Sequence, residues 1–123
     1  MVESIDEVEL LALNMSEGVV VIQTTLPSNW EEYRVGSFCQ NLIENGAKCV
    51  EYSEVRSMYE WDGKLNSEME WRIEMKCSAV KKAVLLNFLE RNHPYELPQI
   101  LFHVAESSEA YGRWVQSHDN TSV

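Results

Sequence analysis

The chain of 123 residues has no long apolar run, and this absence bears on where the protein works. A helix that crosses a membrane needs roughly 20 consecutive apolar residues, and no segment approaches that length. The amino terminus, Met1 to Glu7, is acidic, whereas a secretory signal peptide begins with a basic region. The sequence therefore predicts a cytoplasmic protein with no membrane partner.

Positive charge and cysteine are also scarce. The 10 Lys and Arg residues face 20 Asp and Glu residues, which gives a formal net charge of −10. Nucleic-acid affinity depends on Lys and Arg that neutralise phosphates, so no nucleic-acid partner is expected. The acidic surface either attracts cations or serves solubility alone. Cys39, Cys49 and Cys77 form no Cys-x-x-Cys pair, and an odd number does not suit a disulfide framework, so reduced thiols are expected.

Sequence motifs of catalysis are missing as well. The chain has no Gly-x-Ser-x-Gly elbow, no glycine-rich phosphate loop and no metalloprotease helix motif. It also has no His-x-His or His-x-x-x-His pair, so no single element supplies the three or four ligands that zinc or copper needs. The sequence predicts that the protein is not an enzyme.

A long β-hairpin is the clearest feature that is present. Asp62-Gly63 lies between two extended runs and predicts a type I′ turn. Apolar and charged residues alternate from Leu65 to Lys76, which is typical of a strand with a core face and a charged face. At about 3.3 Å per residue each arm spans on the order of 40 Å, more than one small domain covers. Tyr59 and Trp61 would then be exposed, so we expect an oligomerisation arm.

The elements around the hairpin predict one α+β domain. Val19–Ile22 is a β-branched run typical of a central, buried strand. Ser28 and Glu31 have the spacing of a capping box for a helix that begins near Asn29, and Gly46 is placed to end that helix.

The second half adds two helices and a strand. Ser78 is placed to cap a helix that Pro94 closes, Ile100–Val104 favours a strand, and Ser108 begins a short final helix. The order β-α-β-β-α-β, with a helix after it, is that of a ferredoxin-like sandwich: an antiparallel sheet with both main helices on one face. The other face would be bare, which is a second reason to expect packing between subunits.

Three segments are expected along the chain. Residues 1–17 form an N-terminal extension whose apolar patch, Val8–Leu13, favours a short helix or a docked tail. Residues 18–118 form the ferredoxin-like domain, and residues 119–123 form a C-terminal tail.

Several motifs, in the same order, resemble the CutA divalent-cation-tolerance family. Ser57–Leu65 is similar to the family's turn with Tyr-x-Trp-x-Gly-Lys, Ala47–Val50 to the start of its second strand, and His93-Pro94-Tyr95 with Pro98 to its His-Pro-Tyr-x-x-Pro corner. The resemblance runs from about Val19 to Val115. It implies a homotrimer joined through the long hairpin.

The chain also departs from the family's pattern. The usual Pro-Gly between Cys49 and the Tyr/Trp turn is absent, which puts the local register in question. Gln23 replaces a second cysteine found in some members, and Phe102-His103 replaces apolar residues and a proline. The sequence resembles a divergent member of the family.

Two candidate sites follow from the residues and the resemblance. The first is a ligand cleft at a subunit interface. Its expected residues are Tyr59, Trp61, Glu70, Lys76, His93 and Tyr95. The alternatives are a solvated charged face for Glu70 and Lys76, and a structural corner for His93, whose protonated ring would favour a helix carboxyl end.

The second candidate is a metal site at Cys49 and His93. A thiolate is a soft ligand suited to copper, and His118 or symmetry-related copies would have to complete the set. The alternative for Cys49 is a small apolar residue packed under a helix.

The resemblance implies a regulatory or binding role in divalent-cation tolerance, with copper(II) or another divalent cation as ligand. Two other functions stay open. One is a sensor of small metabolites similar to the PII signalling proteins, which use inter-subunit clefts. The other is a passive trimeric scaffold for a protein partner.

Overall fold

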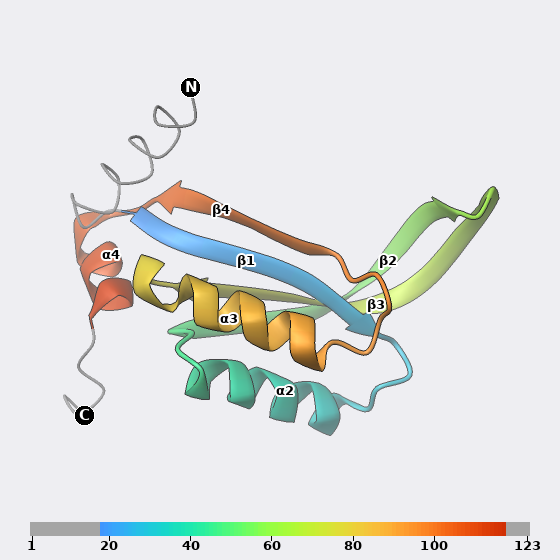
Figure 1. The fold of residues 1–123 in the computed structure, drawn as a ribbon, viewed down its shortest axis with the longest axis horizontal. Helices are drawn as coiled ribbons and strands as arrows, with labels where there is room; N and C mark the ends of the chain where they lie inside the picture. The colour runs from blue at the N-terminus through green and yellow to red at the C-terminus, as the bar shows by residue number, and fades with distance from the viewer. Residues whose placement is uncertain (1–17, 118–123) are drawn as a thin grey trace.

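The protein forms a four-stranded antiparallel sheet with two long helices on one face (Figure 1). The computed structural model describes residues 18–117, and the expected segments at residues 1–17 and 119–123 lie outside that range. The strand order is β2-β3-β1-β4, which confirms the predicted ferredoxin-like α+β fold. The elements are β1 (Gly18–Pro27), α2 (Glu32–Glu44), β2 (Cys49–Trp61), β3 (Lys64–Cys77), α3 (Ala79–Asn92), β4 (Ile100–Glu106) and α4 (Glu109–Gln116).

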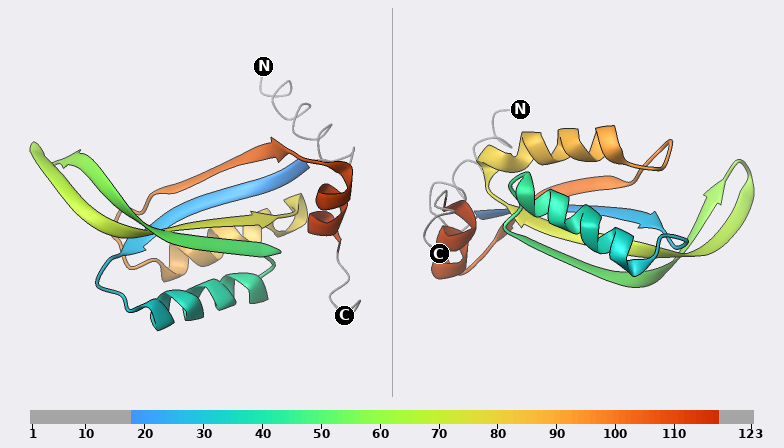
Figure 2. Two further views of the ribbon diagram at one scale, coloured as in Figure 1. Left: turned by 180° about the vertical axis from the view of Figure 1, so that it is seen from behind. Right: turned by 90° about the horizontal axis from the view of Figure 1, so that it is seen from below.

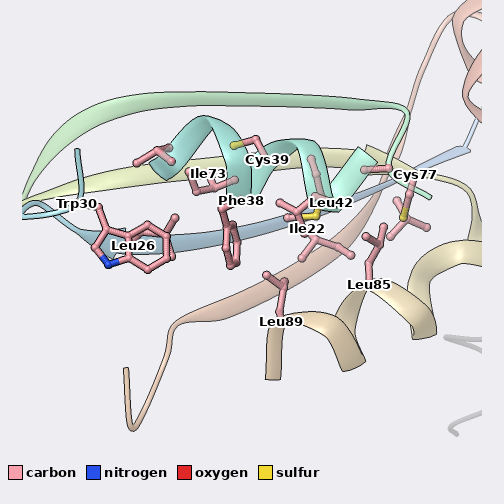
Figure 3. Packing of buried hydrophobic residues seen from close by; sticks show 14 residues of the cluster. Ile22, Leu26, Trp30, Phe38, Cys39, Leu42, Ile73, Cys77, Leu85 and Leu89 are labelled. Atoms are coloured by element: carbon pink, nitrogen blue, oxygen red, sulfur yellow. The ribbon is translucent and has the colours of Figure 1, made fainter. Parts of the chain in front are cut away.

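The core lies between the sheet and the helices α2 and α3. Because side chains alternate along a strand, Ile22 of β1 and Ile73 of β3 face the helices, where both are fully buried. Leu42 of α2 and Leu89 of α3 close the cluster on the helix side of the sheet (Figure 3). Each such side chain contributes about 1.5–3 kcal/mol when it is fully buried, so this layer fixes the register of the central strands.

The other sheet face is not wholly bare, contrary to the expectation from element order. Val19 and Val21 point away from α2 and α3, yet both are buried because Val115 of α4 and Ala105 of β4 pack against them. The remainder of this face carries no α2 or α3, as the view from behind shows (Figure 2). The β-branched run of β1 is therefore central and covered on both sides, as predicted.

The hairpin turn forms at Asp62-Gly63, as the sequence predicts. Asp62 and Gly63 have φ angles of 56° and 76°, as a type I′ turn requires. β2 and β3 pair in a continuous register from Cys49 opposite Lys76 to Trp61 opposite Lys64, so the missing Pro-Gly leaves no bulge.

The outer half of the hairpin extends beyond the body of the domain (Figure 1). The alternation had placed Leu65 on the core face, but its side chain is 75% exposed. Burial on that face begins only near Trp71, where the helices cover the strand. The apolar pattern therefore continues past the part of the sheet that one chain can cover.

The start of α2 differs from the sequence prediction. The helix begins at Glu32 rather than near Asn29, its N-cap is Glu31, and no side chain caps it. A turn closed by the Trp30 N–H and the Pro27 carbonyl occupies the preceding residues, so the Ser28 capping box does not form.

The end of α2 is as predicted. Gly46 has a φ of 119°, and the Ala47 N–H bonds the Leu42 carbonyl at 3.0 Å. Together with the bond from the Gly46 N–H to the Ile43 carbonyl, this is a Schellman motif, which favours glycine at the left-handed position.

Within residues 18–117, no helix is long and apolar enough to cross a membrane. The cytoplasmic location stays a prediction.

Candidate functional site

The loop that joins α3 to β4 lies beside the hairpin (Figure 1). Residues of both line a pocket of about 530 Å³ at the base of the protruding part of the hairpin. Strands β1, β2 and β3 and that loop all contribute side chains. The lining residues are Thr25, Ser57, Met58, Tyr59, Trp61, Glu68, Glu70, Tyr95, Glu96, Leu97 and Gln99.

Strand alternation explains why the hairpin side chains meet here. Ser57, Tyr59 and Trp61 share one face of β2 because they are two residues apart. Ser57 pairs with Glu68 in the register, so Glu68 and Glu70 of β3 lie on that same face. The loop after Pro94 then carries Tyr95 to Glu70.

Glu70 is a buried carboxylate in the pocket wall that accepts two side-chain hydrogen bonds. Only 9% of the residue is exposed, so the predicted alternative of a solvated charged face does not hold at this position. The Ser57 hydroxyl donates to Oε1 and the Tyr95 hydroxyl donates to Oε2, both at 2.6 Å. Burial and the bond to Glu70 raise the pKa of Tyr95, so its phenol stays protonated and keeps donating.

His93 positions this corner and does not line the pocket. Its Nδ1 accepts the Tyr95 N–H at 3.1 Å, and its Nε2 lies 2.9 Å from the Thr24 hydroxyl. Burial lowers the pKa of His93, although a backbone bond at Thr25 and the charge of Glu70 oppose the shift. Burial therefore disfavours the protonated imidazole expected at the helix end, whereas the contacts with Tyr95 and Thr24 agree with the alternative of a structural corner.

Lys76 lies away from the pocket within one chain. It is six residues from Glu70 along β3, or roughly 20 Å. Its ammonium bonds Glu51 at 2.6 Å and Glu74 at 3.0 Å. Burial alone would lower the pKa of Lys76, but these two carboxylates outweigh burial and raise it. One chain thus gathers Tyr59, Trp61, Glu70 and Tyr95, and Lys76 can join only from another copy.

The residues expected to bind metal are also apart. Cys49 faces away from α2 and α3 and lies close enough to Tyr111 of α4 to raise the pKa of that phenol, after burial, which is the larger cause. His93 contacts Thr24, which points to the opposite face. Between residues 18 and 117, no three His, Cys, Asp or Glu side chains are arranged to hold a metal ion. His118 is outside the described residues.

The other two thiols suit a structural role. Cys39 and Cys77 are buried and unbridged, as expected for reduced cysteines. Burial raises the pKa of each thiol to about 11, which keeps it protonated and a poor metal ligand.

Sequence reasoning missed five polar residues of the pocket: Thr25, Ser57, Glu68, Glu96 and Gln99. The place of Glu68 in the pocket could have been predicted, because it lies two residues before Glu70 on the same strand face. The place of Glu96 could not, because it depends on the course of the α3–β4 loop.

The pocket favours positive charge. Three carboxylates and the rings of Tyr59, Trp61 and Tyr95 form its wall, and the lining contributed by residues 18–117 includes no Lys, Arg or His. Carboxylates and aromatic faces both attract cations.

One protein family matches most of the chain. The family model described as CutA1 divalent ion tolerance protein matches residues 20–118. The divalent-cation tolerance protein CutA of Yersinia pestis (strain Pestoides F) is 29% identical over 108 residues, which cover 86% of this chain and 88% of that protein.

Solved structures agree. CutA from Synechococcus elongatus superposes with a TM-score of 0.71 at 27% identity, over 80% of this chain and 88% of that chain. The PII-like protein CutA from Nostoc sp. PCC 7120 superposes with a TM-score of 0.64 at 30% identity, over 79% and 93%. With its sheet order, its hairpin and a match over residues 20–118, the chain belongs to the CutA1 divalent ion tolerance protein family.

Proposed function

We propose that this CutA-family protein is a regulatory binding protein, not an enzyme, and that the pocket at the hairpin base binds a small organic cation. This is the metabolite-sensor function, which the PII-like description of the Nostoc relative also supports. Ligand occupancy would change the position of the hairpin relative to the α3–β4 loop, because the pocket lies between them.

The observation that carries the proposal is the environment of Glu70. A buried carboxylate is costly unless an opposite charge or several donors compensate it. Both donors to Glu70, the hydroxyls of Ser57 and Tyr95, are neutral. A ligand cation would supply the opposite charge.

The shape and chemistry of the wall narrow the ligand class. A cavity of about 530 Å³ is within the usual range of roughly 300–1,000 Å³ for small-molecule sites. Trp61 and Tyr59 present ring surface, which favours an alkylated ammonium over a bare, strongly hydrated ion. A nucleotide would need basic side chains, which the described lining lacks.

Isothermal titration calorimetry on the full chain tests the proposal. The probes are choline, its neutral isostere 3,3-dimethyl-1-butanol, and 1,4-diaminobutane. We expect an ammonium probe to bind, the neutral isostere not to bind, and Glu70→Gln to weaken binding about tenfold. Glu90→Gln, an exposed change on α3, is the matched control and should leave binding unchanged.

Equal binding of choline and its neutral isostere would contradict the proposal, as would the absence of binding by both ammonium probes. If Glu70→Gln folds poorly, binding of the ammonium probes can be measured in Glu96→Gln, at the exposed rim of the pocket. It should weaken binding less than Glu70→Gln does.

A metal role at Cys49 is the second candidate. Its support is the partial exposure of the Cys49 thiol on the face away from α2 and α3, where another subunit could add ligands, together with the divalent-cation tolerance of the family. Copper(II) titration of the wild type and Cys49→Ala is the test. Unchanged copper affinity in Cys49→Ala would reject the thiol site.

Assembly as a homotrimer belongs to the same proposal. The protruding hairpin exposes Met58, Trp61 and Leu65, which are too apolar to remain in water without cover. A second copy is also the route by which Lys76 and His93 would join the cleft. Native mass spectrometry should show three chains, and a stable monomer would contradict it.

A further inference from the structure

A second cavity adjoins the pocket at the hairpin base. Residues of the hairpin and of the turn between β1 and α2 line it, and its volume is about 580 Å³. Glu68 and Tyr95 line both cavities, so the two meet at these residues. The second cavity lies on the other face of the hairpin. Arg56 and Met69 of its wall pair with each other, and Met69 shares the face of β3 on which Trp71 packs against the core.

The sheet has an unpaired edge between the two cavities. β1 ends at Pro27, opposite Glu70, so β3 residues 64–69 pair with β2 alone. Within residues 18–117, no other strand lies along that outer edge. The chain of a flexible ligand can therefore pass around the edge of β3, from one face of the hairpin to the other.

The two cavities differ in charge. Three carboxylates and no cation face the first, as described above. In the second, Arg56 is the one cation of the described lining and Glu68 is the one carboxylate. Glu68 accepts the Tyr59 hydroxyl at 2.7 Å on the face of the first pocket, so its charge lies on that side of the strand. The second cavity is therefore the positive one of the pair.

Arg56 has no acidic partner in the part of the chain that the structure describes. Its guanidinium donates to the Ser67 hydroxyl at 3.1 Å, which is a neutral acceptor on the same face. Since 20 acidic residues face 10 basic ones in this chain, an arginine without a carboxylate is not expected by chance. A guanidinium carries five N–H donors in a planar fork that matches a carboxylate, so Arg56 keeps donors for a ligand. Ser28 and Asn29 add neutral donors to the same wall.

We infer that the ligand of this protein is dipolar: its ammonium lies beside Glu70 in the first pocket, and its carboxylate binds Arg56 beyond the edge of β3. The inference rests on the function proposed above and names the class of its ligand. Side-chain ends on opposite faces of a strand are roughly 10 Å apart, as the spacing of stacked sheets shows. A flexible chain therefore joins the two charges, which excludes an α-amino acid, whose charges are adjacent.

The test is isothermal titration calorimetry on the full chain with 8-(trimethylammonio)octanoate and its methyl ester. The ester keeps the ammonium and loses the carboxylate charge. We expect the acid to bind the wild type about tenfold more tightly than the ester does, because an arginine–carboxylate pair is lost in the ester. Arg56→Gln should abolish this difference by weakening the binding of the acid alone. Arg91→Gln, an exposed change on α3 outside both cavities, is the matched control and should keep the difference.

Glu70→Gln separates this inference from the proposed function, because it should weaken the binding of acid and ester alike. Equal affinities of the wild type for acid and ester, both weakened by Glu70→Gln, would overturn the inference and leave the cation pocket in place. A tenfold difference that persists in Arg56→Gln would also overturn it. Failure of both probes to bind the wild type would contradict the inference and the proposed function together.

Discussion

The Tyr95 hydroxyl donates a hydrogen bond of 2.6 Å to Glu70, and this bond joins the α3–β4 loop to the base of the hairpin. We predict that Tyr95→Phe lowers the free energy of unfolding by about 1–2 kcal/mol, because Glu70 is buried and would lose one of two donors. Urea denaturation at fixed protein concentration measures this change.

Tyr59→Phe is the matched control for that experiment. Tyr59 also donates to a carboxylate, Glu68, at 2.7 Å, but both groups are exposed to water. Exposed bonds of this kind add little to stability. A larger loss of unfolding free energy in Tyr59→Phe than in Tyr95→Phe would show that the burial of Glu70 does not strengthen the Tyr95–Glu70 bond.

Stability should fall in mild acid because of His93. Its folded pKa lies below the ordinary value of 6.5, so the unfolded chain binds more protons in mild acid and stability rises with pH. The contribution is complete above about pH 6.5 and is lost as the pH falls through that value toward the folded pKa.

Thermal unfolding from about pH 7.5 to about pH 5.5 measures this loss. His93→Gln should flatten the profile, whereas His103→Gln, an exposed change on β4, should keep the wild-type slope. The pKa of Glu74 is lowered, chiefly by its bond from Gln23, so its contribution disappears only in stronger acid. A profile that stays steep in His93→Gln would assign the loss to another group.

Alanine substitutions at Gly46 and Gly36 should change the free energy of unfolding in opposite directions. Gly46→Ala should lower the free energy of unfolding by about 1–3 kcal/mol, because its φ is 119° and the new Cβ would collide with Lys81. Gly36→Ala should raise it by about 0.5–1 kcal/mol, because that site is inside α2 with no atom within 4 Å of the new Cβ. Chemical denaturation of the pair measures both, and a shared sign would contradict the backbone argument.

Alanine substitutions at Ser78 and Ser108, the N-cap residues of α3 and α4, should change stability by different amounts. Ser108→Ala should lower the free energy of unfolding by about 1 kcal/mol, because Ser108 accepts the Tyr111 N–H in the first turn of α4. Ser78→Ala should have little effect, because the Ser78 side chain accepts no hydrogen bond from the first turn of α3. A comparable loss in both variants would mean that Ser78 caps α3 in solution.

Much of the fold could be predicted because its signals are local. Asp62-Gly63 specifies its turn through the φ angles of two residues, and Val19–Ile22 specifies a buried strand through side-chain type alone. Gly46 and Ser108 end and begin helices through the bonds of their own turn. The element order then restricted the topology to a ferredoxin-like sheet.

The candidate site was only partly predictable, because proximity across the chain is not a local property. The pattern placed Glu70 and Lys76 on one strand face, but it could not say that Glu70 is buried by Tyr95 while Lys76 is paired roughly 20 Å away. The helix start at Glu32 was also missed, because the turn before it competes with the capping box.

The sequence by itself determined the elements, their order and the long hairpin, since each depends on contacts within a few residues. Only the tertiary structure decided the burial of His93, which lowers its pKa, and the burial of Glu70 against two neutral donors. Both depend on which distant groups exclude water from a side chain, because the free energy of a buried charge is set by those neighbours.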